Sequence, residues 1–157
     1  MPQMNKGGKF IFGKSIIHKD GTIQFPLQAI EEYRITSENK IYLFTGSKKT
    51  GGFCVTRRGL FYPSKIGHIL QETPSLLEFA TKPGEFVKYK GRYYCWLPIS
   101  IDGKIKLNKD VMNFLEIIPN MELLSIRSSN IAFTMGAKGP LLEKAKKYKG
   151  EIPVFWM

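Results

Sequence analysis

The sequence predicts a mostly β protein of the α+β class, in which a pseudo-twofold axis relates two halves of one chain. Three observations predict this: a motif that occurs twice, alternation of polar and apolar residues around each copy, and a length suited to one domain or two very small ones. Residues 20–26 read DGTIQFP, and 82 positions later residues 102–108 read DGKIKLN. A chain of 157 residues can bury a core without disulfides or metals.

Each half shows the same order of expected elements: a strand, a DG turn, a second strand, a short helix and a β-hairpin. In the first half we expect strands at residues 9–18, 22–25, 40–46 and 53–57, with Pro26 in the first turn of the helix. In the second half we expect them at residues 91–96, 98–101, 104–107, 121–127 and 131–135, with Asn108 capping the helix. The expected apolar faces of the two helices are Leu27, Ile30 and Tyr33, and Val111, Phe114 and Leu115.

The two halves align with an offset of 82, residues 20–47 against residues 102–129. Five aligned positions are identical, and further apolar positions correspond, such as Phe25 with Leu107. After each hairpin comes a glycine and then helical sequence, at residues 63–70 and 75–80 in the first half and 140–148 in the second. This shared order favours an internal duplication, with residues 1–80 as the first unit, 81–86 as a Pro- and Gly-marked linker and 87–157 as the second unit.

A single unit of this kind can bury little apolar surface alone. Two units that face each other can share one barrel core and remove their exposed strand edges. We therefore expect a pseudo-twofold β-barrel built from two β-α-β-β repeats, with extra short helices.

The repeated unit resembles the SpoVT/AbrB swapped-hairpin family. The motif of that family runs roughly G-R-V-V-I-P, followed by a short helix, L-G-I, a tight turn and two strands. Residues 21–26 (GTIQFP) and Ile35 match it in the first half, and residues 103–108 (GKIKLN) and Ile117 match it in the second. The resemblance covers about 40 residues of each half. It implies a barrel of interleaved hairpins, normally formed by two chains.

The resemblance also implies a function, because members of this family are mostly DNA-binding transition-state regulators or antitoxins. They bind duplex DNA with basic side chains at the start of the GR strand and on the short helix. The arginine after the glycine corresponds to Thr22 in the first half and to Lys104 in the second. We therefore expect a DNA-binding transcriptional regulator in which the second half dominates the contact with double-stranded DNA.

The net charge favours a polyanionic partner. Twenty-four Lys and Arg against thirteen Asp and Glu give +11, and the pI is near 9.7. The excess is +5 in residues 1–80 (11 basic, 6 acidic) and +6 in residues 81–157 (13 basic, 7 acidic). A positive field spread over both halves attracts nucleic acid first.

The candidate contact residues fall into three groups. Alternation puts Lys104 and Lys106 on the outer face of one strand, and Lys109 follows on the first helical turn. Lys48 and Lys49 lie in the first hairpin turn, where basic residues can reach phosphates or protect a strand edge. The last group flanks the hairpins: Arg57, Arg58 and Arg127. Ion pairs with Glu31, Glu32 or Glu122 would explain these arginines equally well.

Other motifs suggest weaker alternatives. Residues 88–96 (KYKGRYYCW) interleave cations and aromatics as binders of single-stranded nucleic acid do, although such strands are more often core. Residues 136–150 lead into a basic amphipathic helix whose first amides could hold an anion. Catalytic motifs are absent, and the Cys and His residues lack metal-site spacing, so we expect no enzyme, cofactor or metal, and two buried thiols, Cys54 and Cys95.

A second class of function stays open: a non-enzymatic protein-interaction or small-ligand-binding barrel whose basicity is incidental. A homodimer is compatible with either function. The N-terminus lacks a secretory signal and no apolar run approaches the roughly 18 residues of a membrane span, so we expect a cytoplasmic protein outside the membrane.

Overall fold

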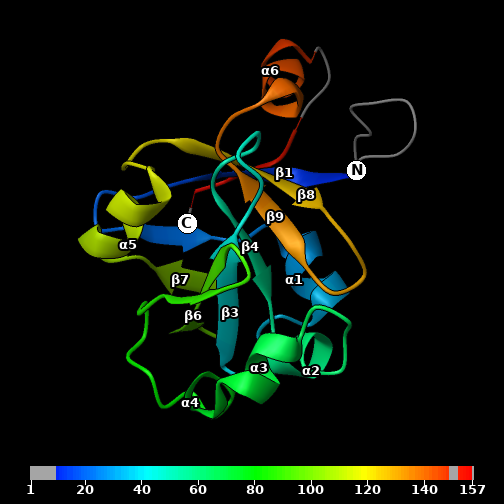
Figure 1. Cartoon of the computed structure of the whole chain (residues 1–157). Coiled ribbons are helices and arrows are strands. Elements are labelled where there is room, and N and C mark those ends of the chain that lie inside the picture. The colour runs from blue at the N-terminus through cyan, green and yellow to red at the C-terminus, as the bar shows by residue number, and fades with distance from the viewer. Residues whose placement is uncertain (1–9, 149–151, 157) are drawn as a thin grey trace.

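The computed structural model describes residues 10–148 and 152–156. In that part of the chain it has ten strands and six helices, so the expected α+β class with mostly sheet is confirmed (Figure 1). The strands are β1 (Ile11–Ile16), β2 (Thr22–Gln24), β3 (Lys40–Thr45), β4 (Phe53–Thr56), β5 (Val87–Tyr89), β6 (Arg92–Pro98), β7 (Lys104–Lys106), β8 (Glu122–Arg127), β9 (Phe133–Gly136) and β10 (Val154–Phe155). The helices are α1 (Leu27–Tyr33), α2 (Arg58–Phe61), α3 (His68–Glu72), α4 (Pro74–Leu77), α5 (Lys109–Leu115) and α6 (Pro140–Lys147).

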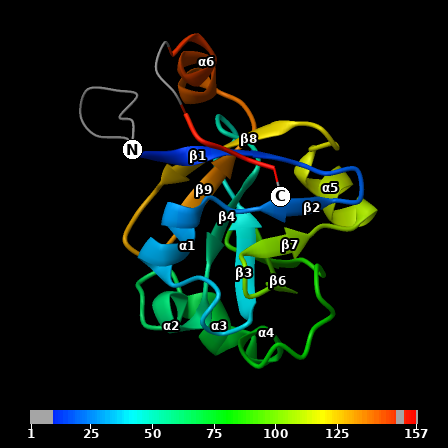
Figure 2. The ribbon, with the colours of Figure 1, turned by 180° about the vertical axis from the view of Figure 1, so that it is seen from behind.

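The strands form two sheets. The larger has the order β10-β1-β8-β9-β4-β3-β6-β5, and the smaller pairs β2 with β7. Figure 2 shows β2 and β7 side by side, with α1 and α5 flanking them. The ladders of the described residues leave β10 and β5 as edges of the larger sheet, so the expected closed barrel is not found among them.

Most strand pairs join the two halves of the chain. β1 pairs with β8 and β3 with β6, both antiparallel. β4 pairs with β9 and β2 with β7. Elements recur at the sequence offset: β2 and β7 begin at residues 22 and 104, α1 and α5 at residues 27 and 109, and β3 and β8 at residues 40 and 122. Among the described residues, the pairs within one half are the hairpins β3–β4, β5–β6 and β8–β9.

The two DG turns have the same backbone structure. Gly21 and Gly103 have φ of 88° and 87°, a region that favours glycine because it lacks a Cβ. The Leu107 amide donates to the Gly21 carbonyl at 3.0 Å, and the Phe25 amide donates to the Gly103 carbonyl at 3.0 Å. Each turn is therefore tied to the half of the chain that does not contain it.

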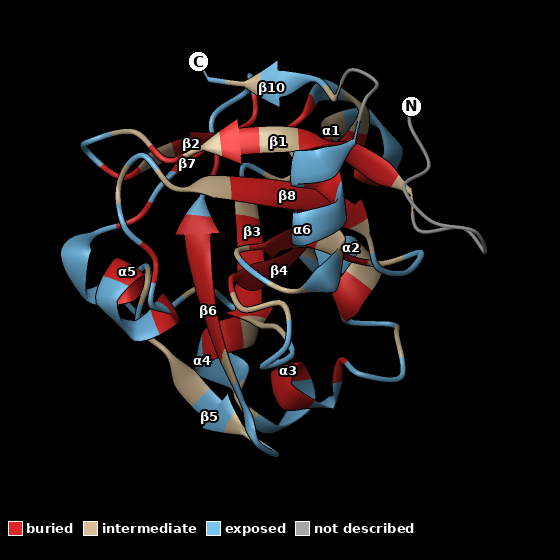
Figure 3. Cartoon of the chain, turned by 90° about the horizontal axis from the view of Figure 1, so that it is seen from above, coloured by how far each residue is buried: buried red, intermediate tan, exposed pale blue. Residues whose placement is uncertain are grey.

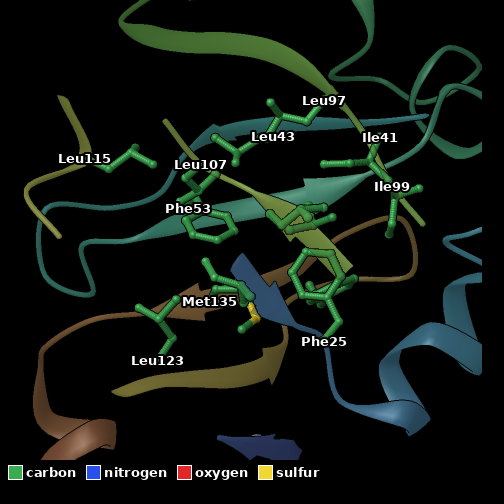
Figure 4. Close-up of a cluster of buried hydrophobic side chains, with 14 of the residues drawn as sticks. Phe25, Ile41, Leu43, Phe53, Leu97, Ile99, Leu107, Leu115, Leu123 and Met135 are labelled. Atoms are coloured by element: carbon green, nitrogen blue, oxygen red, sulfur yellow. The ribbon is translucent and has the colours of Figure 1, made fainter. Parts of the chain in front are cut away.

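The main core lies between the larger sheet and the layer of β2, β7, α1 and α5 (Figure 4). Leu43 faces this core, and its neighbour Phe44 faces the other side of the sheet, as strand alternation requires. Ile23 and Ile105 close the core from the small sheet. We call the side of the larger sheet that faces this core its inner face, and the opposite side its outer face.

The outer face is covered in two places. The segment containing α2, α3 and α4 packs Phe61 against Tyr42, Phe44 and Tyr94. Helix α6 packs Leu142 and Ala145 against residues of β1 and β8 (Figure 3). Cys54 and Cys95 are buried free thiols, as expected. None of the helices in the described ranges is long and apolar enough to cross a membrane.

Two helix faces differ from expectation. Leu27 and Phe114 are 60% and 45% exposed, so their placement on the buried faces of α1 and α5 is wrong. Each helix has only seven residues, about two turns. Tyr33, Val111 and Leu115 are buried as predicted, Ile30 is partly buried against the core, and Ala29 and Met112 are buried without having been predicted.

Other differences concern short elements. Helical structure after the first hairpin begins at Arg58, and residues 99–101 lie outside β6. Strands β5 and β10 were not predicted. Residues 81–86 carry neither helix nor strand, and the Trp96 indole donates to the Thr81 carbonyl at 2.8 Å, so this segment packs on the second half. The first residue of the strand expected at residues 9–18 and the last two of the stretch at residues 136–150 lie outside the described residues.

Candidate nucleic-acid interface

The small sheet presents two of the candidate lysines. In its ladder Thr22 lies opposite Lys106, Ile23 opposite Ile105 and Gln24 opposite Lys104. Both isoleucines are buried, whereas Lys106 is exposed and Lys104 half-buried. The pleat therefore directs the two lysines away from the core, as the alternation predicts.

Helix α5 adds a third candidate. The Asn108 side chain accepts a hydrogen bond from the Val111 amide at 2.9 Å, which is the expected N-cap. This cap places Lys109, exposed, as the first helical residue directly after β7. The structure thus brings Lys104, Lys106 and Lys109 together at one edge of the molecule.

Lys19 joins this group, although the sequence analysis did not select it. A hollow of about 360 Å³ is lined by Lys19, Lys106 and Lys109. Lys19 immediately precedes the first DG turn, and the antiparallel pairing of β2 with β7 carries it to the second half. Only the register of β2 against β7 identifies Lys19 as a neighbour of the second-half lysines. We call Lys19, Lys104, Lys106 and Lys109 the lysine strip.

Two acidic residues, Asp20 and Asp102, reduce the positive charge of the lysine strip. The Lys104 ammonium lies 2.9 Å from an Asp102 carboxylate oxygen. Hydrogen bonds from the Ser100 hydroxyl and from Lys104 lower the pKa of Asp102, and the Thr22 amide lowers that of Asp20. An exposed ion pair contributes little stability. In the described part of the chain, Lys19, Lys106 and Lys109 form no ion pair, although Asp20 lines the same hollow as they do. Their ammonium groups are therefore more available to phosphate than that of Lys104.

The equivalent positions of the first half are neutral. Thr22, Gln24 and Leu27 occupy the places of Lys104, Lys106 and Lys109 at the offset of 82. Gln24 is only 8% exposed, and its amide donates to the Asp102 carbonyl at 2.8 Å. Of these aligned positions, only those of the second half are therefore basic.

Lys48 and Lys49 are not part of the same surface. Both are exposed in the turn between β3 and β4. Lys49 lines a hollow on the outer face of the larger sheet, whereas the lysine strip belongs to the layer that packs against the inner face. The sheet thus separates the two lysine groups.

Two of the candidate arginines hold the fold together. Arg57 donates through Nε to the Tyr33 carbonyl at 2.9 Å and through a terminal nitrogen to Glu38 at 2.7 Å. Arg127 binds both carboxylate oxygens of Glu32, one of them at 2.7 Å from Nε. The hydrogen bonds that Arg127 donates to the Glu32 carboxylate raise the pKa of Arg127. Two hydrogen bonds fix the orientation of each guanidinium, so fewer of its N–H groups can bind a phosphate.

Arg58 is the third arginine of this group. Its guanidinium donates to the Leu77 carbonyl at 3.1 Å and lies 5.0 Å from the centre of the Phe79 ring. These contacts join the start of α2 to the end of α4. The three arginines do not gather with the lysine strip, and each has partners within the fold.

The aromatic stretch at residues 88–96 is mostly core. Tyr94 and Trp96 are 5% and 9% exposed and belong to the aromatic cluster on the outer face. Tyr89 and Tyr93 are half-buried. With two of the four rings in the core, this strand offers little surface on which successive bases could stack.

No protein-family model matches this chain, and a search of curated proteins finds no match. Among the described residues, no three His, Cys, Asp or Glu side chains gather where they could hold a metal ion. The resemblance to the SpoVT/AbrB family therefore remains a proposal that depends on the motif residues and on the strand pairing.

Proposed function

We propose that this chain is a cytoplasmic DNA-binding transcriptional regulator built from two SpoVT/AbrB-like swapped-hairpin units. It docks on double-stranded DNA through the lysine strip. One observation carries the proposal: β2 and β7 pair across the two halves, so that Lys106 lines one hollow with Lys109 and Lys19, and Lys104 lies two positions before Lys106 on the same strand.

The strand exchange supports the two-unit part of the proposal. In a swapped-hairpin arrangement each unit gives strands to the sheet of the other. Here the strand before the DG turn of each half pairs with the strand after the short helix of the other half, β1 with β8 and β6 with β3. Residues 1–80 and 87–157 would be the two units, and residues 81–86 the segment that joins them. The units would enclose the core between the larger sheet and the β2–β7 layer.

Docking would rest mainly on phosphate contacts. Lysines on a strand and at a helix start can straddle a phosphate backbone, and such contacts position the protein without reading the sequence. Base readout would be limited, because neutral side chains occupy the first half of the surface. Since one chain presents one basic half, we propose that a homodimer supplies the second half on a longer duplex.

The test is a salt titration of binding to duplex DNA of random sequence. With about three phosphates neutralised, the logarithm of the binding constant should fall with the logarithm of salt concentration with a slope of about −3. The variant Lys104→Gln/Lys106→Gln/Lys109→Gln should bind at least about tenfold more weakly at low salt, with a slope shallower by about 2 to 3.

A second triple variant controls for net charge. Lys65→Gln/Lys82→Gln/Lys88→Gln removes the same charge from exposed positions outside the strip. It should bind DNA like the parent protein, and both variants should keep the parent melting temperature. Equal losses in the two variants, or tighter binding to single-stranded than to duplex DNA, would contradict the proposal.

A further inference from the structure

A hollow of about 500 Å³ lies on the outer face of the larger sheet, between the two covers of that face. Its floor is made by neighbouring strands: Phe44 of β3, Cys54 of β4, Thr134 of β9 and Ile126 of β8. Helix α6 contributes one wall, and the segment before α3 contributes another. The hollow thus sits over the central β4–β9 pair, where the two halves of the chain meet.

Backbone contacts fix the rim of the hollow. The Ala137 and Lys138 amides donate to the Thr50 carbonyl at 2.8 and 2.9 Å, which docks the β3–β4 turn on the loop before α6. Gly139, with φ of 107°, allows this approach, because a Cβ there would lie 2.6 Å from the Lys49 carbonyl oxygen. The shape of the site is therefore built into the fold and does not depend on side-chain positions alone.

The polar lining is cationic and hydroxylic. Lys49, Arg92 and Lys144 line the hollow from three separate segments, and no carboxylate lines it. None of the three forms an ion pair with a carboxylate of the described ranges. The hydroxyl groups that line the hollow belong to Ser47, Thr50, Ser128, Ser129 and Thr134. Three cations with hydroxyl donors and no acid attract an anion.

The rest of the lining is apolar. Ile66 and Leu141 line the hollow from the two walls, and Phe44 and Ile126 line it from the floor. The Arg92 guanidinium lies 5.7 Å from the centre of the Phe44 ring, an arrangement that can hold a flat group beside it. Pockets for small molecules have a similar volume and a mostly apolar lining with a few polar groups.

From these observations we infer that the outer hollow is a binding site for a small organic anion. The anionic group, a phosphate, sulfonate or carboxylate, pairs with Lys49, Arg92 and Lys144. An aromatic or aliphatic body packs on Phe44, Ile126 and Leu141. A DNA duplex is too wide to enter a hollow of this size. The inference goes beyond the proposed DNA contact and does not depend on it.

Cys54 makes this a site for binding and not for thiol chemistry. Cys54 is 8% exposed as a residue of the floor, and its sulfur lies 3.4 Å from the Thr134 hydroxyl oxygen. Burial raises the pKa of Cys54, so the reactive thiolate is scarce near neutral pH. The occupant is therefore held without covalent attachment.

The experiment uses two fluorescent probes with the same aromatic body. 8-Anilinonaphthalene-1-sulfonate carries a sulfonate, and N-phenyl-1-naphthylamine lacks it. Titration of the full chain should show one sulfonate probe bound per chain, at least about tenfold more tightly than the uncharged probe. The variant Arg92→Gln/Lys144→Gln should lose that difference, so that both probes bind with similar, weak affinity.

The control variant Lys88→Gln/Lys147→Gln removes the same charge from β5 and α6, at positions that do not line the hollow. It should bind the sulfonate probe like the parent protein, and both variants should melt at the parent temperature. Equal affinity of the two probes for the parent, or equal losses in the two variants, would overturn the inference. So would displacement of the probe by duplex DNA together with loss of DNA binding in Arg92→Gln/Lys144→Gln. The lysine-strip variant should keep the probe site, so failure of the DNA proposal leaves this result interpretable.

Discussion

At the scale of single residues, three glycines in the left-handed backbone region differ in what surrounds them. Gly91, with φ of 82°, has no atom within 4 Å of the position that a Cβ would take. At Gly103 that Cβ would lie 2.1 Å from Cδ1 of Ile30, the end of a flexible side chain. At Gly21 it would lie 2.0 Å from the Leu107 carbonyl oxygen, which belongs to the backbone between β7 and α5. Alanine at Gly91 would therefore suffer backbone strain alone, whereas alanine at Gly103 or Gly21 would also collide with a neighbouring atom.

Substitution by alanine should destabilise the protein least at Gly91, more at Gly103 and most at Gly21. Backbone strain alone should cost about 1 kcal/mol at Gly91. Movement of the Ile30 side chain should raise the cost to about 2 kcal/mol at Gly103, and the immobile carbonyl to about 4 kcal/mol at Gly21. Urea unfolding followed by circular dichroism measures the three free energies. If Gly21→Ala were no worse than Gly91→Ala, the contact between the DG turn and β7 would not be tight.

The buried thiol of Cys95 predicts a loss of stability in alkaline solution. Cys95 is fully buried in the main core, and burial raises its pKa from 9.0 to about 12. The folded protein thus holds this proton more firmly than the unfolded chain. Below pH 9 the full stabilisation is present, and as pH rises from 9 towards 12 it is lost at up to about 1.4 kcal/mol per pH unit.

Urea unfolding between about pH 8 and pH 11 tests this sign. The free energy of unfolding of the parent protein should fall more steeply with pH than that of Cys95→Ala, which lacks the thiol. Burial also raises the pKa of Tyr33 and Tyr42, but both remain in the variant, so the difference between the slopes isolates Cys95. Parallel slopes would mean that the thiol titrates alike in the folded and unfolded chains.

At the scale of elements, the sequence predicts the strands with strong alternation and the turns with glycine. β2 and β7 follow their DG turns as expected, and β3, β4 and β8 agree with prediction within a residue or two. β5 and β10, of three and two residues, carry too little sequence for a period to appear. Leu27 is misplaced because a seven-residue helix has its first side chain at an exposed end, so spacing alone does not fix its direction.

The same reasoning explains which parts of the candidate interface could be predicted. Lys104 and Lys106 follow from alternation within one strand, and Lys109 from the next element along the chain. Lys19 belongs to the other half and depends on a strand register, which local sequence does not contain. For the arginines the sequence leaves phosphate contacts and ion pairs with Glu31, Glu32 or Glu122 as alternatives. The structure pairs Arg127 with Glu32, one of these, and Arg57 with Glu38, which is not among them.

The neutral half of the small sheet predicts a gain of function. Thr22 and Leu27 occupy the positions equivalent to Lys104 and Lys109, and Leu27 is 60% exposed. If the lysine strip binds DNA, Thr22→Lys/Leu27→Lys should bind duplex DNA more tightly, with a salt slope steeper by about 2. Filter binding across a salt series measures both quantities.

A control variant adds two lysines at another place on the surface, to test whether the gain depends on their position or only on net charge. Ser37→Lys/Ser75→Lys adds the same charge at exposed positions outside the small sheet. Its slope should stay within about half a unit of the parent value. If both double variants gained equally, DNA affinity would follow net charge and not this surface.

At the scale of the whole molecule, the sequence indicates that two similar halves exist but not how they pair. Periodicity identifies a strand and its buried face, whereas the packing of the complete core decides which distant strand it pairs with. The outer hollow shows the same limit, because Lys49, Arg92 and Lys144 come from separate parts of the chain and meet only through the sheet. Their isolated positions in the sequence carry no common motif.

The pairing predicts that neither half folds alone. Five of the eight ladders found among the described residues join the first half to the second: β1–β10, β1–β8, β2–β7, β3–β6 and β4–β9. A separate half would keep only its hairpins, and an isolated hairpin is marginally stable in water. Residues 1–80 and 81–157, produced as two polypeptides, should each lack a cooperative thermal transition at concentrations where they stay monomeric.

Mixing the two polypeptides in equal amounts should restore the structure, because all ladders between the halves can form without the connecting peptide bond. The mixture should elute as a one-to-one complex and melt in a single transition. The intact chain should melt at a higher temperature than the complex, because the covalent link removes the entropy cost of association. Far-ultraviolet circular dichroism and the fluorescence of buried Trp96 should follow the same curve in both samples. A cooperative transition in monomeric residues 1–80 would show instead that each half has a core of its own.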